Sequence, residues 1–72
     1  MTVTKYQLKK GVCFFKPYGA IHRMIILAVW EDKEVVLVER YDCEGGWHDN
    51  AMFSFEQFLN KLELSQFTIQ KI

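Results

Sequence analysis

The stretch Met24-Ile25-Ile26-Leu27-Ala28-Val29-Trp30 decides the fold, because these seven consecutive residues are the longest apolar run in the chain. The run is too short to span a membrane as a helix, and its β-branched residues favour a strand. Four charged residues follow at positions 31–34, and a second segment rich in valine occupies positions 35–41. Two such segments around a short charged turn predict a β-hairpin made of residues 22–30 and 35–41.

A helix is predicted downstream, where the apolar period changes. Within residues 52–64, four apolar side chains fall on one helical stripe: Phe55, Phe58, Leu59 and Leu62. Ser54 and Gln57 have the spacing of a capping box at the start of this stripe. Phe53 and Phe58 stand at the two positions of a hydrophobic staple. These local patterns predict a helix that begins just after Ser54.

Three shorter segments complete the predicted order of elements. Residues 2–8, 12–16 and 67–70 are rich in β-branched and aromatic side chains, which is typical of strands. With the hairpin and the helix they give the order β-β-β-β-α-β. A chain of 72 residues has room for one core, so residues 1–72 are expected to form one domain. We predict an α+β fold, an antiparallel sheet of about four or five strands with one helix on one face. A small barrel of the SH3 or OB kind is the alternative.

Strict alternation along the strands divides their side chains between two faces of the sheet. The first face is aliphatic and suited to the helix stripe: Val12, Phe14, Ile25, Leu27, Val29, Val36 and Val38. The second face is larger, aromatic and sulfur-containing: Cys13, Phe15, Met24, Ile26, Ala28, Trp30, Val35, Leu37 and Tyr41. One helix cannot cover both faces. The terminal strands, a second copy of the chain or another protein must cover the second one.

Residues 42–52 are expected to form a long loop between the sheet and the helix. The segment combines two glycines with Trp47, His48 and several acidic or amide side chains. Long loops of this composition often bind a partner. The alternative is a simple crossover in which Trp47 closes one end of the core.

The cysteines and histidines supply the residue types of a zinc site without its usual spacing. Cys13, His22 and Cys43 fall on one face in the predicted register, so a thiol or metal site there is kept as an alternative. We expect instead two reduced cysteines, no metal and no cofactor. A disulfide is disfavoured because two strands separate the cysteines by about 9–10 Å. No phosphate loop or nucleophile motif is present, so we do not expect an enzyme.

The leading functional hypothesis is a non-catalytic protein-binding module. It would be a small accessory or inhibitor protein, or a self-associating dimer, that uses the second face and the 42–52 loop. The residues predicted to bind the partner are Phe15, Met24, Ile26, Trp30, Tyr41, Trp47 and His48. We expect it in the cytoplasm and away from membranes, because no signal peptide or membrane span is visible. Its size is also compatible with a product of a phage or other mobile element.

Nucleic-acid binding is the alternative from a different functional class. Basic and aromatic side chains alternate around one predicted turn: Phe14, Lys16, Tyr18, His22 and Arg23. Residues 1–30 carry five basic side chains and no acid, whereas residues 31–72 carry four basic and nine acidic ones. An antiparallel sheet that brings the halves together would neutralise this asymmetry. Five scattered cations also fall short of the basic stripe of a typical nucleic-acid binder.

Overall fold

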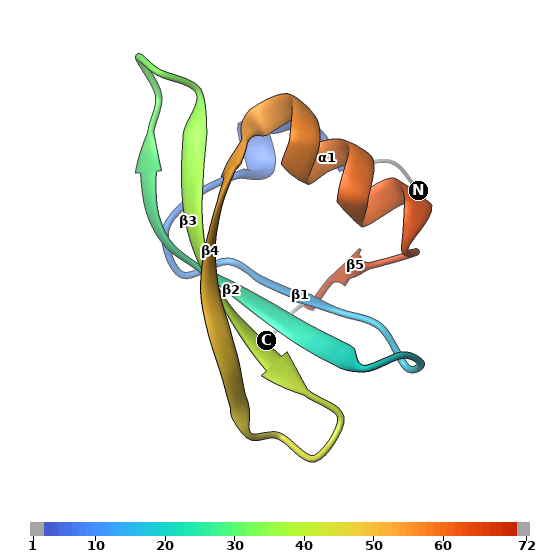
Figure 1. Cartoon of the computed structure of the whole chain (residues 1–72). Helices are drawn as coiled ribbons and strands as arrows, with labels where there is room; N and C mark the ends of the chain where they lie inside the picture. Colours follow the sequence, from blue (N-terminus) through green and yellow to red (C-terminus); the bar gives the residue numbers. More distant parts are fainter. Residues whose placement is uncertain (1–2, 71–72) are drawn as a thin grey trace.

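One open sheet and one helix make up the fold, as seen in a computed structural model that describes residues 3–70. The elements are η1 (Lys5–Gln7), β1 (Cys13–Phe15), β2 (Ile21–Trp30), β3 (Val35–Asp42), β4 (Trp47–Ser54), α1 (Phe55–Leu64) and β5 (Thr68–Ile69). The five strands form an antiparallel sheet in the order β4-β3-β2-β1-β5, and α1 lies across its concave side (Figure 1). This confirms the predicted α+β fold and element order. The sheet is open, with β4 and β5 at its two edges, rather than a closed barrel.

The N-terminal segment differs from its prediction. Residues 2–8 were predicted as a strand, but the described part forms the 3-10 turn η1. The backbone N–H of Thr4 donates to the side-chain carbonyl of Gln7 at 2.8 Å, which satisfies a donor that a strand would have needed to pair. Leu8 then enters the core, where it is 2 % exposed. Residue 2 lies outside the described residues.

The predicted 42–52 loop is also wrong, because most of it is strand β4. The chain reverses within residues 43–46, and Gly45 adopts φ +86°, which strongly favours glycine. The Asp42 carboxylate accepts hydrogen bonds from the backbone N–H groups of Glu44 and Gly46 at 2.9 and 3.0 Å. This side chain organises a tight turn, so the chain can pair at once with β3 as the fourth strand.

The helix begins where its local patterns predict. The Ser54 hydroxyl accepts a hydrogen bond from Gln57 N–H at 3.1 Å, and the Gln57 side chain accepts one from Ser54 N–H at 3.2 Å. The rings of Phe53 and Phe58 lie 5.6 Å apart, as the staple requires. The helix buries Phe55, Phe58 and Leu62 against the sheet. Both the capping box and the staple are therefore confirmed.

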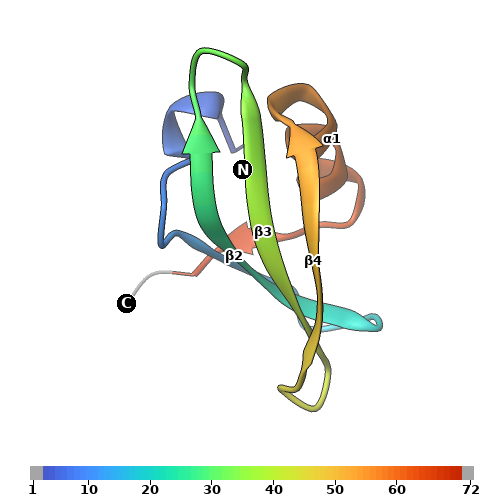
Figure 2. The same ribbon diagram turned by 60° about the vertical axis from the view of Figure 1, so that its left-hand side comes forward.

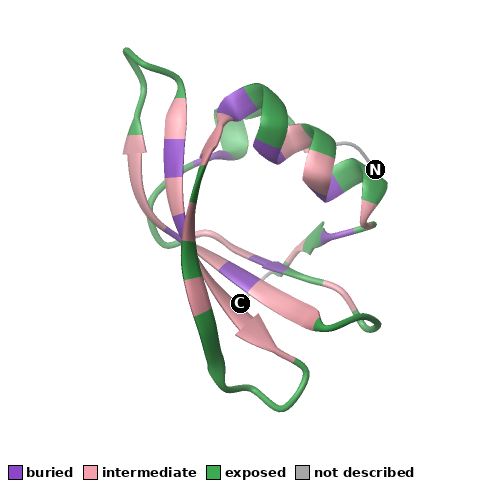
Figure 3. Ribbon diagram, viewed as in Figure 1, coloured by how far each residue is buried: buried purple, intermediate pink, exposed green. Residues whose placement is uncertain are grey.

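The inner face of the sheet is the side that α1 covers, and it holds most of the core (Figure 3). Its apolar members are Phe14, Met24, Ile26, Val29, Val36, Val38, Ala51 and Phe53. Phe14, Val29, Val36 and Val38 were assigned to this face correctly.

Met24 and Ile26 were assigned to the opposite face, and this was wrong, because they are 0 % and 1 % exposed in the core. The error has one cause. The register between β2 and β3 shifts between Ile26 and Ala28, so Leu27 is an extra residue. A one-residue bulge reverses the alternation of every residue beyond it, which turns Met24 inward and Ile25 outward.

The terminal segments pack on the inner side of the sheet. Leu8 and Phe67 belong to the same buried cluster, and Val3 packs against it. Strand β5 continues the sheet by pairing with β1, where Ile69 lies opposite Phe14. Within residues 3–70 the terminal segments therefore do not cover the other face. Residues 71–72, which were considered as part of such a cover, lie outside the described residues.

Candidate interface on the outer face

The outer face is the side of the sheet opposite α1. Figure 2 shows β2, β3 and β4 on this side, with the helix behind them. The strand register places its side chains in four rows across the sheet. The rows are Trp30–Val35–Ser54, Ala28–Leu37–Met52, Cys13–Ile25–Glu39–Asn50 and Thr68–Phe15–Arg23–Tyr41–Trp47.

Large apolar side chains on this face are open to solvent. Trp47 is 61 % exposed, Met52 60 %, Phe15 41 % and Trp30 39 %. Smaller apolar residues between them, such as Leu37, are only half-buried. Within residues 3–70, α1 lies behind these strands (Figure 2), and Val3, Leu8 and Phe67 of the terminal segments pack in the core instead. An apolar area of this kind on a small protein is typical of an interaction surface.

A polar cluster occupies the third and fourth rows of the outer face. The Arg23 guanidinium lies 4.7 Å from the centre of the Tyr41 ring. The Tyr41 hydroxyl donates a hydrogen bond of 2.7 Å to the Glu39 carboxylate. This bond raises the pKa of Tyr41 above its usual value, because the carboxylate stabilises the protonated phenol. The cluster fixes one aromatic ring and leaves further acceptor capacity on Glu39.

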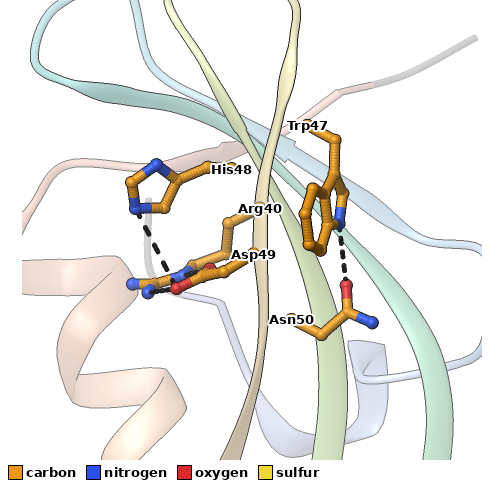
Figure 4. Close-up of polar contacts among 5 residues, drawn as sticks. All are labelled: Arg40, Trp47, His48, Asp49 and Asn50. Atoms are coloured by element: carbon orange, nitrogen blue, oxygen red, sulfur yellow. Dashed lines mark hydrogen bonds and ion pairs between the residues drawn. The ribbon is translucent and has the colours of Figure 1, made fainter.

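Strand β4 separates two sets of polar contacts (Figure 4). On one side of the strand, the Trp47 indole N–H donates to the Asn50 side-chain oxygen at 3.0 Å, which orients the exposed ring. On the other side, Arg40 makes two hydrogen bonds to the Asp49 carboxylate. These bonds lower the pKa of Asp49 and raise that of Arg40. His48 stands beside the pair, with Nε2 3.9 Å from Asp49 Oδ2.

Four of the seven residues predicted to bind a partner lie on the outer face: Phe15, Tyr41 and Trp47 share one row, and Trp30 stands in the row at the opposite end. His48 is an extra residue at the register shift between β3 and β4, and its side chain is exposed on the edge strand. Met24 and Ile26 are in the core and cannot touch a partner in this fold. Met52 was missed as part of the face, although the alternation of residues 47–54 would place it there once that segment is read as a strand.

The residues predicted to bind nucleic acid do not form one surface. Phe14 is completely buried, with its ring 5.4 Å from that of Phe58. The Lys16 ammonium lies 4.8 Å from the centre of the Phe67 ring. His22 packs edge-on against Phe15 on the outer face. Tyr18, 81 % exposed, stands in the turn between β1 and β2, and Arg23 is held against Tyr41.

The strand register does not gather Cys13, His22 and Cys43 in the way that the thiol or metal hypothesis expected. His22 was expected opposite Cys43, but Ile21 pairs with Asp42 and Cys43 lies in the turn. Among residues 3–70 no three metal-ligating side chains of the His, Cys, Asp or Glu types gather. Cys13 and Cys43 are both free thiols.

Acidic turns stand at both ends of β3. The turn between β2 and β3 holds Glu31, Asp32 and Glu34 with one lysine, Lys33, and all four side chains are exposed. The turn between β3 and β4 follows Asp42 and holds an exposed Glu44. Because β3 joins the two turns, the acids lie at the two ends of that strand.

Two hollows in the described part of the chain lie largely away from the outer face. One of about 740 Å³ is lined by residues of α1, β5 and the N-terminal segment, among them Val3, Leu59 and Phe67. A second, of about 370 Å³, lies by the β1–β2 turn and the end of α1, beside Tyr18 and Leu64. Apart from Thr68, residues of the outer face line neither hollow. Its shape suits a macromolecular surface better than a small ligand, which needs a concave site.

The chain matches no protein-family model, no curated protein and no solved structure. The one α-helix of residues 3–70 is too short to cross a bilayer.

Proposed function

We propose that this chain is a small non-catalytic protein-binding module that docks another protein on the outer face of its sheet. The observation that carries the proposal is an apolar and aromatic sheet face without intramolecular cover within residues 3–70. Trp30, Trp47 and Met52 supply its exposed bulk. A role as an accessory or inhibitor protein in the cytoplasm, where free thiols stay reduced, fits this reading.

The composition of the outer face supports a protein partner. Tryptophan, tyrosine, phenylalanine, methionine and arginine are the residue types enriched at protein interfaces, and all five occur in its rows. Two of the aromatic rings are held in place: Tyr41 by Arg23 and Glu39, and Trp47 by Asn50. Ordered aromatic side chains lose less entropy on binding and suit the role of anchors.

Nucleic-acid binding has weaker support. Phe14 is buried and cannot stack on a base. The acidic turns around Glu31 and Glu44 would repel phosphates approaching either end of the outer face.

The test compares capture of a partner by three forms of the chain, each immobilised and exposed to an extract of the cells that produce it. Leu37→Lys places a charge in the middle of the outer face. Leu64→Lys makes the same change at a site on α1 that is 76 % exposed. We expect a protein that is retained by the wild type and by Leu64→Lys and is lost with Leu37→Lys.

Circular dichroism must show that all three forms are folded. If Leu37→Lys is unfolded, Met52→Lys replaces it, because Met52 is 60 % exposed on the edge strand. Equal capture by the wild type and a folded outer-face variant would contradict the proposal.

A further inference from the structure

We infer that two copies of this chain pair through the free edge of β4, as antiparallel strands related by a two-fold axis at Ala51. The second copy extends the sheet and does not cover its outer face, so this interface is separate from the docking site proposed above. The inference is carried by the hydrogen-bond register of β4, which shows which main-chain groups are left to pair.

The end of the β3–β4 ladder shows which main-chain groups of β4 reach the free edge. Phe55 N–H, one residue after β4, donates to Glu34 C=O at 2.8 Å. Residues of an antiparallel ladder alternate between those that bond to the neighbouring strand and those whose groups point away from it. Counting back from Phe55 along the regular register, the N–H and C=O groups of Asn50 and Met52 point away from β3.

The β4 edge lacks most of the features that protect a sheet edge. Natural edges are blocked by short strands, lysine, proline, bulges or inward-facing charges. The opposite edge strand, β5, has only two residues, whereas β4 has eight and contains neither lysine nor proline. The register shift of β4 lies near its start, before Asp49, and the inward-facing carboxylate of Asp49 is paired with Arg40. Residues 49–53 therefore form a regular edge that is open to another strand.

The register centred on Ala51 uses main-chain groups that are free. With Ala51 opposite its own copy, Asn50 lies opposite Met52 of the second copy, and the two exchange N–H and C=O groups on each side of the axis. A register centred on Met52 would need the N–H of Ser54, which already donates to a side chain of α1. A register centred on Asn50 would need His48, the extra residue at the register shift. The hydrogen bonds thus select one pairing.

The outer side of this pairing joins exposed apolar side chains of the two copies. Trp47 and Met52, 61 % and 60 % exposed, both belong to β4. A hydrogen bond holds the Trp47 indole against Asn50, and Asn50 lies opposite Met52 of the second copy. The indole of one copy therefore becomes a neighbour of the thioether of the other, and contacts between sulfur and aromatic rings are favourable.

The inner side of the pairing brings opposite charges together. The Lys61 ammonium lies 5.9 Å from the centre of the Phe53 ring. In the register centred on Ala51, Phe53 of one copy lies opposite Asp49 of the other. The Asp49 carboxylate therefore gains the Lys61 ammonium of the second copy as a neighbour. The small side chain of Ala51 suits the axis, because main chains approach most closely at a non-hydrogen-bonded pair.

The size of the interface and the acidic turns limit its strength. Pairing along one strand buries less surface than a standard protein interface. The turn at residues 43–46 of one copy comes to the end of the sheet that carries residues 31–34 of the other. Glu44 and the acids of 31–34 are exposed, so salt screens their repulsion. We expect a weak dimer with a dissociation constant of about 10–100 µM.

Sedimentation equilibrium between about 1 µM and about 1 mM protein, in about 0.15 M salt, tests the pairing. We expect the wild type to shift from monomer to dimer. N-methylation of Met52 in a synthetic chain removes the outward N–H, keeps the side chain and should weaken the dimer at least about tenfold. Leu37→Lys changes the outer face and should dimerise like the wild type. A wild type that stays monomeric, or an N-methylated chain that dimerises equally, would overturn the inference.

Cysteine cross-linking tests the register, in a background with Cys13→Ser and Cys43→Ser. Ala51→Cys places two thiols at directly opposed positions with Cα atoms about 4.5 Å apart, within reach of a disulfide. Met52→Cys places them on a diagonal, with Cα atoms about 7–8 Å apart. With oxidised glutathione as the electron acceptor, Ala51→Cys should form the intermolecular disulfide at least about fivefold faster. Equal or faster cross-linking of the more exposed Met52→Cys would overturn the inference.

Charge reversal tests the inner side of the pairing. Lys61→Glu places an acid beside Asp49 of the second copy and should weaken the dimer by about fivefold or more. Lys10→Glu makes the same change in net charge at an exposed position before β1 and should weaken it by less than about twofold. Circular dichroism must show that every variant is folded. Equal dimerisation by the two variants would overturn the inference.

Discussion

The inner and outer faces of β2, β3 and β4 carry similar apolar side chains but differ in how far these side chains are buried. On the inner face, Val36 and Val38 are 0 % exposed beneath α1. On the outer face, their neighbours Val35 and Leu37 are half-buried, and Trp30 and Met52 are more open still. The strands supply apolar surface to both sides, and only one side has a cover within residues 3–70. The difference shows that hydrophobic pattern alone does not define a core; the covering element does.

Changing the length of β2 by one residue should have the largest effect on this division. Insertion of one alanine between Met24 and Ile25 adds a second extra residue and turns Met24 to the outer face and Arg23 into the core, so we expect the chain not to fold. Deletion of Leu27 removes the bulge but keeps every other residue of the strand on its present face. We expect the deletion variant to remain folded, as measured by circular dichroism and thermal unfolding. If the insertion and the deletion are equally damaging, the bulge has a role beyond alternation.

Replacing one large side chain by alanine on each side of the sheet should cost different amounts of unfolding free energy. Phe58→Ala empties the centre of the core, where Phe58 is 0 % exposed, and should cost about 3–5 kcal/mol of unfolding free energy. Trp30→Ala removes a larger side chain from the outer face, yet we expect a cost of about 1 kcal/mol. Urea unfolding measures both. A cost for Trp30→Ala that matches Phe58→Ala would mean that the outer face contributes to the core.

Removing the N-terminal cap of α1 should destabilise the helix that covers the inner face. Ser54→Ala removes the hydroxyl that caps Gln57 N–H, and we expect a loss of about 1 kcal/mol. Ser65→Ala changes a serine at the other end of α1, where N–H groups need no cap, and serves as the control. Hydrogen exchange of the inner-face amides should accelerate in the first variant only. Unchanged stability in Ser54→Ala would show that the tertiary contacts of Phe55 and Phe58 alone set the position of the helix.

The smallest expected effect is the loss of stability at low pH that comes from the Arg40–Asp49 pair on the inner face. Arg40 lowers the pKa of Asp49, so the folded state favours the ionised carboxylate. The stability from this pair is present above the ordinary aspartate pKa of about 3.9, and it is lost as pH falls through the lower folded value. We expect Asp49→Asn to flatten the acid limb of a plot of unfolding temperature against pH. Arg40→Gln should flatten it similarly, and an unchanged limb in both variants would contradict this account.

Local patterns predicted the elements that depend on neighbouring residues. The capping box of Ser54 and Gln57 and the staple of Phe53 and Phe58 located α1, because each involves residues within five positions of one another. The hairpin was equally visible, since the charged turn at 31–34 separates two apolar segments. The predicted order matches the observed order of strands and helix, but its first strand, residues 2–8, contains the 3-10 turn η1, and the observed fourth strand before the helix is β4.

The faces could not be predicted with the same success. The run from Met24 to Trp30 is apolar at every position, so it has no alternation by which a bulge at Leu27 could be detected. Strand β4 was missed because Gly45 and Gly46 lie in a stretch of polar residues that resembles a loop. With β4 missing, neither the Arg40–Asp49 pair nor the place of Met52 on the outer face could be inferred.

The positions of the two tryptophans have a spectroscopic consequence. Trp30 and Trp47 both lie on the outer face and neither lies in the core, which is filled by phenylalanine and aliphatic side chains. Indole emission from the free protein should therefore resemble that of solvated tryptophan and change little on unfolding. A partner that excludes water from the outer face should shift the tryptophan emission to shorter wavelength. The fluorescence of Trp30 and Trp47 would therefore report docking without an added label.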